Sequence, residues 1–127
     1  MKSKGALTLA ICVILATVLL SLGWVSPAKE HVVQGDSFVK LEQWDEAIAA
    51  YSKAIIIDPQ YIVAYNNRGF AYAQKGYYDK AITDYTKAIE IDPEYARAYN
   101  NRGFAYRAIG EKSKSDADFQ RAAEYNP

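Results

Sequence analysis

Residues 64–72 read AYNNRGFAY, and the same nine residues occur again at 98–106, 34 positions later. A second match has the same spacing, because YSKAI at 51–55 corresponds to YTKAI at 85–89. Self-similarity at a fixed period of this length is typical of repeat proteins built from stacked helical units. The repeat divides most of the chain into three units, at 28–61, 62–95 and 96–127.

Each unit has the residue spacing of two helices. In the second unit Tyr65, Gly69 and Tyr72 lie at i, i+4 and i+7, which places them on one face of a helix. Gly76 ends this helix, and the proline of Asp92-Pro93 ends the helix that follows. We therefore expect a helix–turn–helix in every unit.

Small residues recur on the apolar face of both helices, as in Gly69, Ala81 and Ala88. They allow close helix approach, so we expect the overpacked variant Ala81→Trp to unfold the array. In the last unit Ser115 replaces the corresponding alanine, and residues 111–118 read EKSKSDAD. A terminal repeat needs a polar outer face to stay soluble, so this stretch indicates an end cap.

These features resemble the tetratricopeptide repeat (TPR) family, over residues 28–127. The resemblance implies an all-α fold, a right-handed α-solenoid whose concave groove is lined by the first helix of each unit. Arg68 and Arg102 depart from the leucine usual at that position of the family pattern, and His31 replaces the usual leading aromatic. The family's aromatic, glycine, alanine and proline positions are matched in the second unit by Tyr65, Gly69, Tyr72, Ala81, Tyr85, Ala88 and Pro93.

Carried over by position, the resemblance gives a set of candidate groove residues. In the first unit, and at the start of the second, they are Lys29, Val32, Asp36, Val39 and Val63. The candidate peptide-binding residues are Asn66, Asn67, Phe70, Gln74, Arg97, Asn100, Asn101, Phe104 and Arg107.

The chemistry of this set suits a peptide ligand. An asparagine amide both donates and accepts, phenylalanine contacts apolar side chains, and arginine pairs with carboxylates. A second interpretation of the asparagines is that they bond within or between helices of the scaffold. The variant Asn66→Ala plus Asn100→Ala is expected to fold and to lose partner capture if the peptide interpretation holds.

Some TPR domains hold the C-terminal carboxylate of a ligand with a clamp of lysine, asparagine and arginine side chains. The equivalent positions here carry Val32, Asp36, Asn67, Arg97 and Asn101. Only Asn67 matches, Arg97 matches in part, and Asp36 would repel a carboxylate. The sequence therefore disfavours this clamp.

Residues 6–25 contain no charged side chain, and eleven of these twenty are Leu, Ile or Val. Twenty helical residues span about 30 Å, the thickness of the hydrocarbon core of a bilayer. Lys2 and Lys4 precede the stretch, within a short basic N-terminus of residues 1–5, and Trp24 lies at its far end. We therefore expect a transmembrane helix at 6–25.

Two outcomes stay open for this segment. Its length favours an uncleaved anchor, because the apolar part of a signal peptide usually has about 7–15 residues. Ser26 and Ala28 give the small residues of a cleavage site, which would release a secreted or periplasmic protein. In both cases Lys2 and Lys4 favour a cytoplasmic N-terminus and an extracytoplasmic repeat domain.

Composition excludes several functions. The chain has 15 basic and 15 acidic residues, so nothing favours nucleic-acid binding. A single Cys and a single His exclude a disulfide framework and the common zinc sites. No phosphate-binding loop or nucleophile motif occurs, so we expect no enzyme activity, cofactor or metal.

The sequence therefore predicts a non-catalytic protein–protein interaction module, a membrane-anchored scaffold that presents its groove to a peptide segment of a partner protein. A different hypothesis is a structural unit that associates weakly with copies of itself through its C-terminal face.

Overall fold

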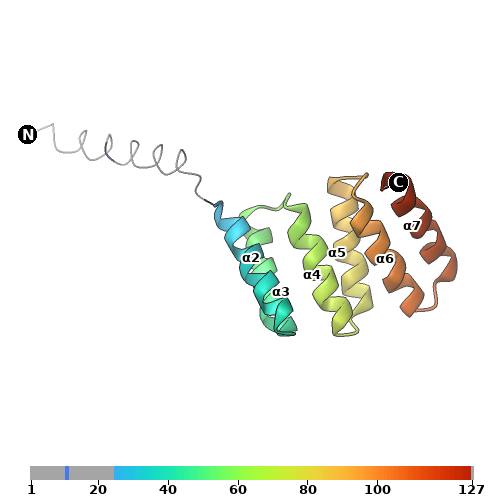
Figure 1. Cartoon of the computed structure of the whole chain (residues 1–127), viewed down its shortest axis with the longest axis horizontal. Helices are drawn as coiled ribbons and strands as arrows, with labels where there is room; N and C mark the ends of the chain where they lie inside the picture. Colours follow the sequence, from blue (N-terminus) through green and yellow to red (C-terminus); the bar gives the residue numbers. More distant parts are fainter. Residues whose placement is uncertain (1–10, 12–24, 127) are drawn as a thin grey trace, which may run out of the picture.

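The computed structural model describes residues 25–126 and Ile11. The described residues form helices joined by short turns, and Figure 1 shows them stacked side by side in chain order. This confirms the predicted all-α class with two helices in each unit. The helices are α2 (Pro27–Lys40), α3 (Trp44–Ile57), α4 (Ile62–Gln74), α5 (Tyr78–Ile91), α6 (Ala96–Ala108) and α7 (Lys112–Tyr125).

The predicted transmembrane segment at 6–25 lies outside the described residues, apart from Ile11 and Val25. It therefore stays a prediction. Within the described part of the chain, no helix combines the length and apolar character needed to cross a bilayer.

Local sequence sets the helix ends. Gly76 and Gly110 occupy the turn inside the second and third units with φ angles of 77° and 83°. Glu42 holds the same turn position in the first unit with φ 56°. A side chain in this left-handed region costs about 1–2 kcal/mol relative to the right-handed one, so the first turn is strained where the other two are relaxed.

In each unit an aromatic ring of the second helix packs directly on a glycine of the first helix. A Cβ atom added at Gly69 would stand 2.7 Å from the Tyr85 ring, and one added at Gly103 would stand 2.8 Å from the Phe119 ring. Ala81 and its equivalents between these helices have no exposed surface. The predicted role of small residues in close helix packing is confirmed.

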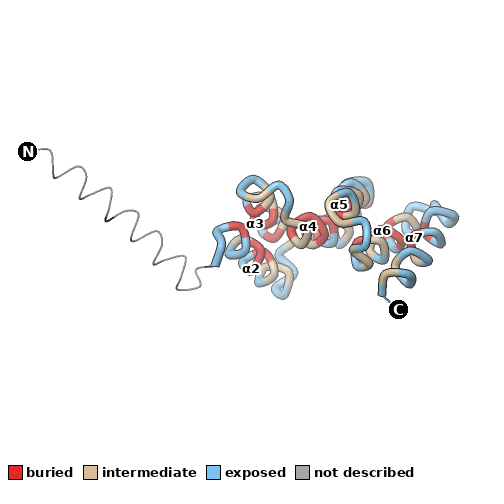
Figure 2. Tube along the Cα trace, turned by 90° about the horizontal axis from the view of Figure 1, so that it is seen from above, coloured by how far each residue is buried: buried red, intermediate tan, exposed pale blue. Residues whose placement is uncertain are grey.

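The first helices, α2, α4 and α6, crowd together on one side of the array. Backbone contacts join α2 to α4 and α4 to α6, whereas within the described residues none join the second helices α3, α5 and α7 to one another. Buried residues gather where the helices face each other (Figure 2). We call the face formed by α2, α4 and α6 the concave face.

An arginine that is paired with an aspartate of its own unit also contacts the preceding unit. The Arg68 guanidinium donates to both carboxylate oxygens of Asp84 at 2.8 Å and to the Ser52 hydroxyl of the preceding unit at 3.0 Å. These hydrogen bonds to Asp84 are the main reason that the pKa of Arg68 is raised. The charged arginine is thus fixed between two units.

The third unit repeats this arrangement. Arg102 donates to Asp118 at 2.7 and 2.8 Å and to Thr86 of the second unit at 3.0 Å. Both arginines replace the leucine usual in the family pattern, so a polar contact takes the place of an apolar one. The first unit has Gln34 and Ala50 at the equivalent positions and cannot form the pair.

Helix α7 is more polar than the other second helices. Asp116 and Ala123 stand where α5 has Ile82 and Ile89, which pack into the cluster that joins α5 to α6. The Ser115 hydroxyl is buried without a hydrogen-bond partner at a position where the earlier units have alanine. The outer side of α7 therefore has the polar character expected of an end cap.

Candidate functional site

Equivalent positions of α2, α4 and α6 form rows across the concave face. One row contains Asp36, Phe70 and Phe104, each 34 residues from the next. Phe70 and Phe104 are 38% and 55% exposed, although phenylalanine is normally buried. The row therefore changes from an acid in the first unit to exposed aromatic rings in the next two.

A chain of hydrogen bonds runs beneath this row and links all three units. The Tyr51 hydroxyl donates to Asp36 Oδ1 at 2.7 Å, and Asn67 Nδ2 donates to the same oxygen at 3.0 Å. Asn66 Nδ2 donates to Asn67 Oδ1 at 3.2 Å, and Asn101 Nδ2 donates to Asn66 Oδ1 at 3.0 Å. Burial, followed by the bond to Asp36, raises the pKa of the Tyr51 hydroxyl. The chain holds the first helices in register.

This chain changes the expectation for Asn66. The residue is 2% exposed, and its amide both donates and accepts within the scaffold. Asn66 is therefore unavailable to a peptide, and replacing it would leave Asn67 and Asn101 with unpaired groups. The prediction that Asn66 contacts a peptide is corrected: the scaffold interpretation holds for this residue.

Asn100, the equivalent of Asn66 in the third unit, lies in a different environment. It is exposed, and among the described residues its side chain has no hydrogen-bond partner. The difference arises because no described first helix follows α6 to cover it. The scaffold interpretation therefore applies to Asn66, and peptide contact by Asn100 stays a prediction.

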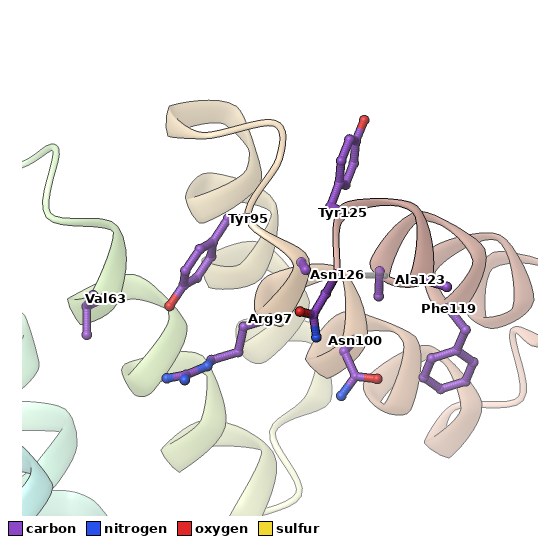
Figure 3. A pocket seen from close by; sticks show the side chains of 10 residues that line it. Val63, Tyr95, Arg97, Asn100, Phe119, Ala123, Tyr125 and Asn126 are labelled. Carbon is purple, nitrogen blue, oxygen red and sulfur yellow. The ribbon is translucent and has the colours of Figure 1, made fainter.

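A pocket of about 850 Å³ lies beside Asn100, between α6 and the end of α7 (Figure 3). Arg97 and Asn100 supply its polar groups from α6, and Phe119 contributes an aromatic ring from α7. Within the described part of the chain, no Asp or Glu side chain lines it. The lining residues are Val63, Tyr95, Ala96, Arg97, Asn100, Phe119, Ala122, Ala123, Tyr125 and Asn126.

A second pocket, of about 380 Å³, lies between the C-terminal halves of α4 and α6. Phe70 and Phe104 stand on its two sides, and none of its lining residues is charged. It suits an apolar side chain. The lining residues are Phe70, Ala73, Gln74, Tyr78, Tyr85, Asn101, Phe104, Ala105 and Ala108.

Arg107 is held by aromatic rings. Its guanidinium lies 4.8 Å from the centre of the Phe119 ring and 6.0 Å from that of Phe104, and these two rings form an edge-to-face pair at 5.0 Å. The residue is exposed near the C-terminal end of α6, and its contact with a peptide stays a prediction.

Other predicted groove residues divide between surface and core. Gln74 and Arg97 are exposed, and Lys29 is exposed near the start of α2. Val32, in contrast, is 4% exposed and belongs to the core between α2 and α3. Its predicted place in the groove is corrected, because the helix turns this side chain toward α3.

The carboxylate clamp is not assembled here. Val32 is buried, and Asp36 brings a negative charge to the face. The Asn67 amide donates to Asp36 and the Asn101 amide donates to Asn66, so each amide already has a partner within the scaffold. The sequence-based argument against the clamp agrees with this geometry.

Sequence reasoning missed the pocket residues outside the first helices. Tyr95 precedes α6, and Phe119 and Tyr125 come from α7. Trp44 of α3 packs its ring edge-to-face on Phe70 at 6.2 Å. Phe119 could have been found from its register, because it stands where the earlier units have Tyr51 and Tyr85.

Known protein families match the repeat region of this chain. Family models described as TPR repeat and tetratricopeptide repeat match residues 35–76, 71–110 and 96–127. They indicate no enzymatic family. Among curated protein sequences, none matches this chain.

Solved structures share the fold. The second TPR of Spaghetti (RPAP3) bound to the HSP90 peptide SRMEEVD is 28% identical, with a TM-score of 0.77 over 80% of this chain and 94% of that one. The TPR2B domain of yeast Sti1, in a complex with pHsp70, is 29% identical, with a TM-score of 0.78 over 80% and 82%. MamA is 32% identical, with a TM-score of 0.75 over 79% and 58%. The chain belongs to the tetratricopeptide repeat family.

Proposed function

We propose that this protein is a non-catalytic interaction module that binds an extended segment of a partner protein across α4 and α6, while residues 6–25 anchor it in a membrane. The observation that carries the proposal is the exposed pair Phe70 and Phe104 on the concave face, beside two pockets. Exposed aromatic rings next to unpaired polar groups are typical of protein-binding surfaces.

Two kinds of contact support peptide binding. The uncharged pocket between Phe70 and Phe104 can take an apolar side chain of the ligand. The Asn100 amide, which has no hydrogen-bond partner among residues 25–126, can donate to and accept from a peptide backbone. Of the similar proteins, an RPAP3 repeat domain was solved with a bound peptide, and the Sti1 domain was solved in a complex.

The ligand we propose is an internal segment rather than a chain terminus. Asp36 stands at a clamp position and would repel a terminal carboxylate, and the amides of Asn67 and Asn101 are already bonded. The similarity to domains that bind HSP90 or Hsp70 peptides therefore supports the location of the binding surface. It does not support binding of a ligand through its C-terminal carboxylate.

Site-specific crosslinking tests the groove. A photoreactive phenylalanine at Phe104, or in place of Gln74, should crosslink in cells to one segment of a single partner. The same group in place of Thr83, which is exposed on α5, should give no such product. Equal crosslinking from Thr83, or none from either concave position, would contradict the proposal.

Membrane anchoring rests on the uncharged stretch 6–25. An anchored protein keeps its full N-terminal mass and resists extraction at alkaline pH. The alternative, a secreted or periplasmic protein, would have a mature N-terminus just after Ala28. Mass spectrometry of the protein from its own membranes distinguishes the two.

Self-association through the C-terminal face receives less support. Asp116 and Ala123 replace the isoleucines that pack at the junction between the second and third units. A polar face of this kind lacks the apolar surface on which another unit would stack. Sedimentation at increasing protein concentration should show a monomer, and a dimer would favour the self-association hypothesis.

A further inference from the structure

Asp36 is the acidic group of the concave row that the other units fill with phenylalanine. It is half-buried, and both of its hydrogen bonds end on Oδ1, at 2.7 Å from the Tyr51 hydroxyl and 3.0 Å from Asn67 Nδ2. Among the described residues, no Lys or Arg lies within 4 Å of it. The carboxylate thus keeps Oδ2 free for a partner outside this chain.

The cations of α2 leave Asp36 without a direct ion pair. Lys40 follows Asp36 by four residues on the same helix face and is exposed, but among the described residues it forms no salt bridge with Asp36. Lys29 precedes Asp36 by seven residues, which is about 10 Å along a helix. A half-buried charge has lost part of its hydration, so a bound cation would be favourable there.

The opposite charge stands at the far end of the face. Arg97 is exposed in the pocket between α6 and α7, and none of the described residues that line that pocket is Asp or Glu. Among the described residues, no acidic side chain pairs with Arg97. The uncharged pocket of Phe70 and Phe104 lies on the same face, between the C-terminal halves of α4 and α6. The concave face therefore carries an acidic group on α2, an aromatic pocket between α4 and α6, and a basic group at the start of α6.

We propose that this face selects a partner segment of matching polarity, with a basic side chain on Asp36, an apolar one between Phe70 and Phe104, and an acidic one on Arg97. The inference rests on the proposed function, since it names the ligand of the same groove. It makes Asp36 and Arg97 the specificity-determining residues.

The fold also sets the spacing of the two ligand charges. Two helix spacings of about 8–10 Å each separate α2 from α6. Arg97 lies about 10 Å further along the helix axis than the α6 position that matches Asp36, because seven residues at about 1.5 Å separate it from Phe104. The diagonal is about 20 Å, which an extended chain at about 3.3 Å per residue covers in about six residues.

Selection from phage-displayed random dodecapeptides tests this, with the full chain in detergent micelles as bait. Peptides displayed at the free end of a coat protein present no C-terminal carboxylate. Phe104→Ala serves as the bait that lacks the aromatic groove. We expect wild-type selections to enrich Lys or Arg about six positions from Asp or Glu, and selections on Asp36→Lys to lose the basic residue.

A double-mutant cycle then excludes a merely structural role for Asp36. Asp36→Asn keeps the oxygen that accepts from Tyr51 and Asn67, so the hydrogen-bond chain is retained. A selected peptide should bind Asp36→Asn at least tenfold more weakly. Replacing the basic residue of the peptide by norleucine should weaken its binding to the wild type by the same factor. The same replacement should weaken its binding to Asp36→Asn little further.

The outcomes separate the two proposals. Peptides that require Phe104 but show no basic residue, or whose basic residue is indifferent to Asp36→Asn, would overturn this inference and leave the proposed function standing. If the wild-type protein enriches peptides no more strongly than Phe104→Ala does, both this inference and the proposed function would be overturned.

Discussion

The nonapeptide AYNNRGFAY forms the centre of both α4 and α6, yet its two copies have different environments. Asn66 is 2% exposed and bonded on both sides of its amide, whereas Asn100 is exposed. Among the described helices, α4 has first helices on both sides, and α6 has one on the side of α4 alone. The identical sequence therefore forms the same helix in both units. Whether a given side chain is buried in the scaffold or exposed on the surface depends on the neighbouring unit.

Other positions of the nonapeptide behave alike in the two copies. Arg68 and Arg102 each bind an aspartate of their own unit and a hydroxyl of the preceding one, with nearly equal distances. These contacts point backward along the chain, where both copies have a neighbour. Substitutions in matched positions can therefore separate the two kinds of residue.

The largest effect is expected at the alanine between the helices of a unit. Ala81→Trp should lower the free energy of unfolding of the array by at least about 3 kcal/mol, because Ala81 has no exposed surface and lies in the central unit. Ser115→Trp at the matched position of α7 should disrupt the last unit only. Urea unfolding followed by circular dichroism measures both, and an unchanged Ala81→Trp transition would refute the packing.

Loss of the buried carboxylates should have similar effects in both units. Asp84→Ala and Asp118→Ala should each cost about 2–3 kcal/mol, since they leave a partly buried arginine without its anion. Asp116→Ala, exposed on α7, is the control and should change the unfolding free energy by less than about 0.5 kcal/mol. Strongly unequal losses at Asp84 and Asp118 would contradict the equivalence of the two junctions.

The asparagine copies should differ. Asn66→Ala should cost about 1–2 kcal/mol, because it strands the Asn101 donor and the Asn67 acceptor. Asn100→Ala should change stability by less than about 0.5 kcal/mol and weaken partner binding instead. Equal destabilisation by both variants would show that Asn100 is covered in solution.

The smallest effect concerns the turns. Glu42→Gly should raise the free energy of unfolding by about 0.5–1 kcal/mol, because it relieves the left-handed backbone that glycine adopts freely in the other units. Gly76→Ala should lower it by about 1 kcal/mol, although nothing would touch the added methyl group. Differential scanning calorimetry of the two variants shows the sign, and a loss from Glu42→Gly would be contrary to this account.

The fold could be predicted because the features that set it are local and repeated. The glycine at Gly69, the turn at Gly76 and the Asp-Pro at the end of α5 each fix a helix end or a close contact without distant information. The position of Asn66 could not be predicted, since its burial depends on Asn101, 35 residues away. Phe119 differs from Asn66, because its match with Tyr51 and Tyr85 in the repeat register was a local signal that sequence reasoning left unused; its ring packs on Phe104 of α6.

Phe104 offers the most direct test of the claim that the concave face is the binding surface. The measurement is the affinity of the full-length protein and of Phe104→Ala for the partner segment identified by crosslinking, with circular dichroism to show that the variant is folded. The account predicts at least tenfold weaker binding by a folded Phe104→Ala protein. Unchanged affinity in that variant would contradict it.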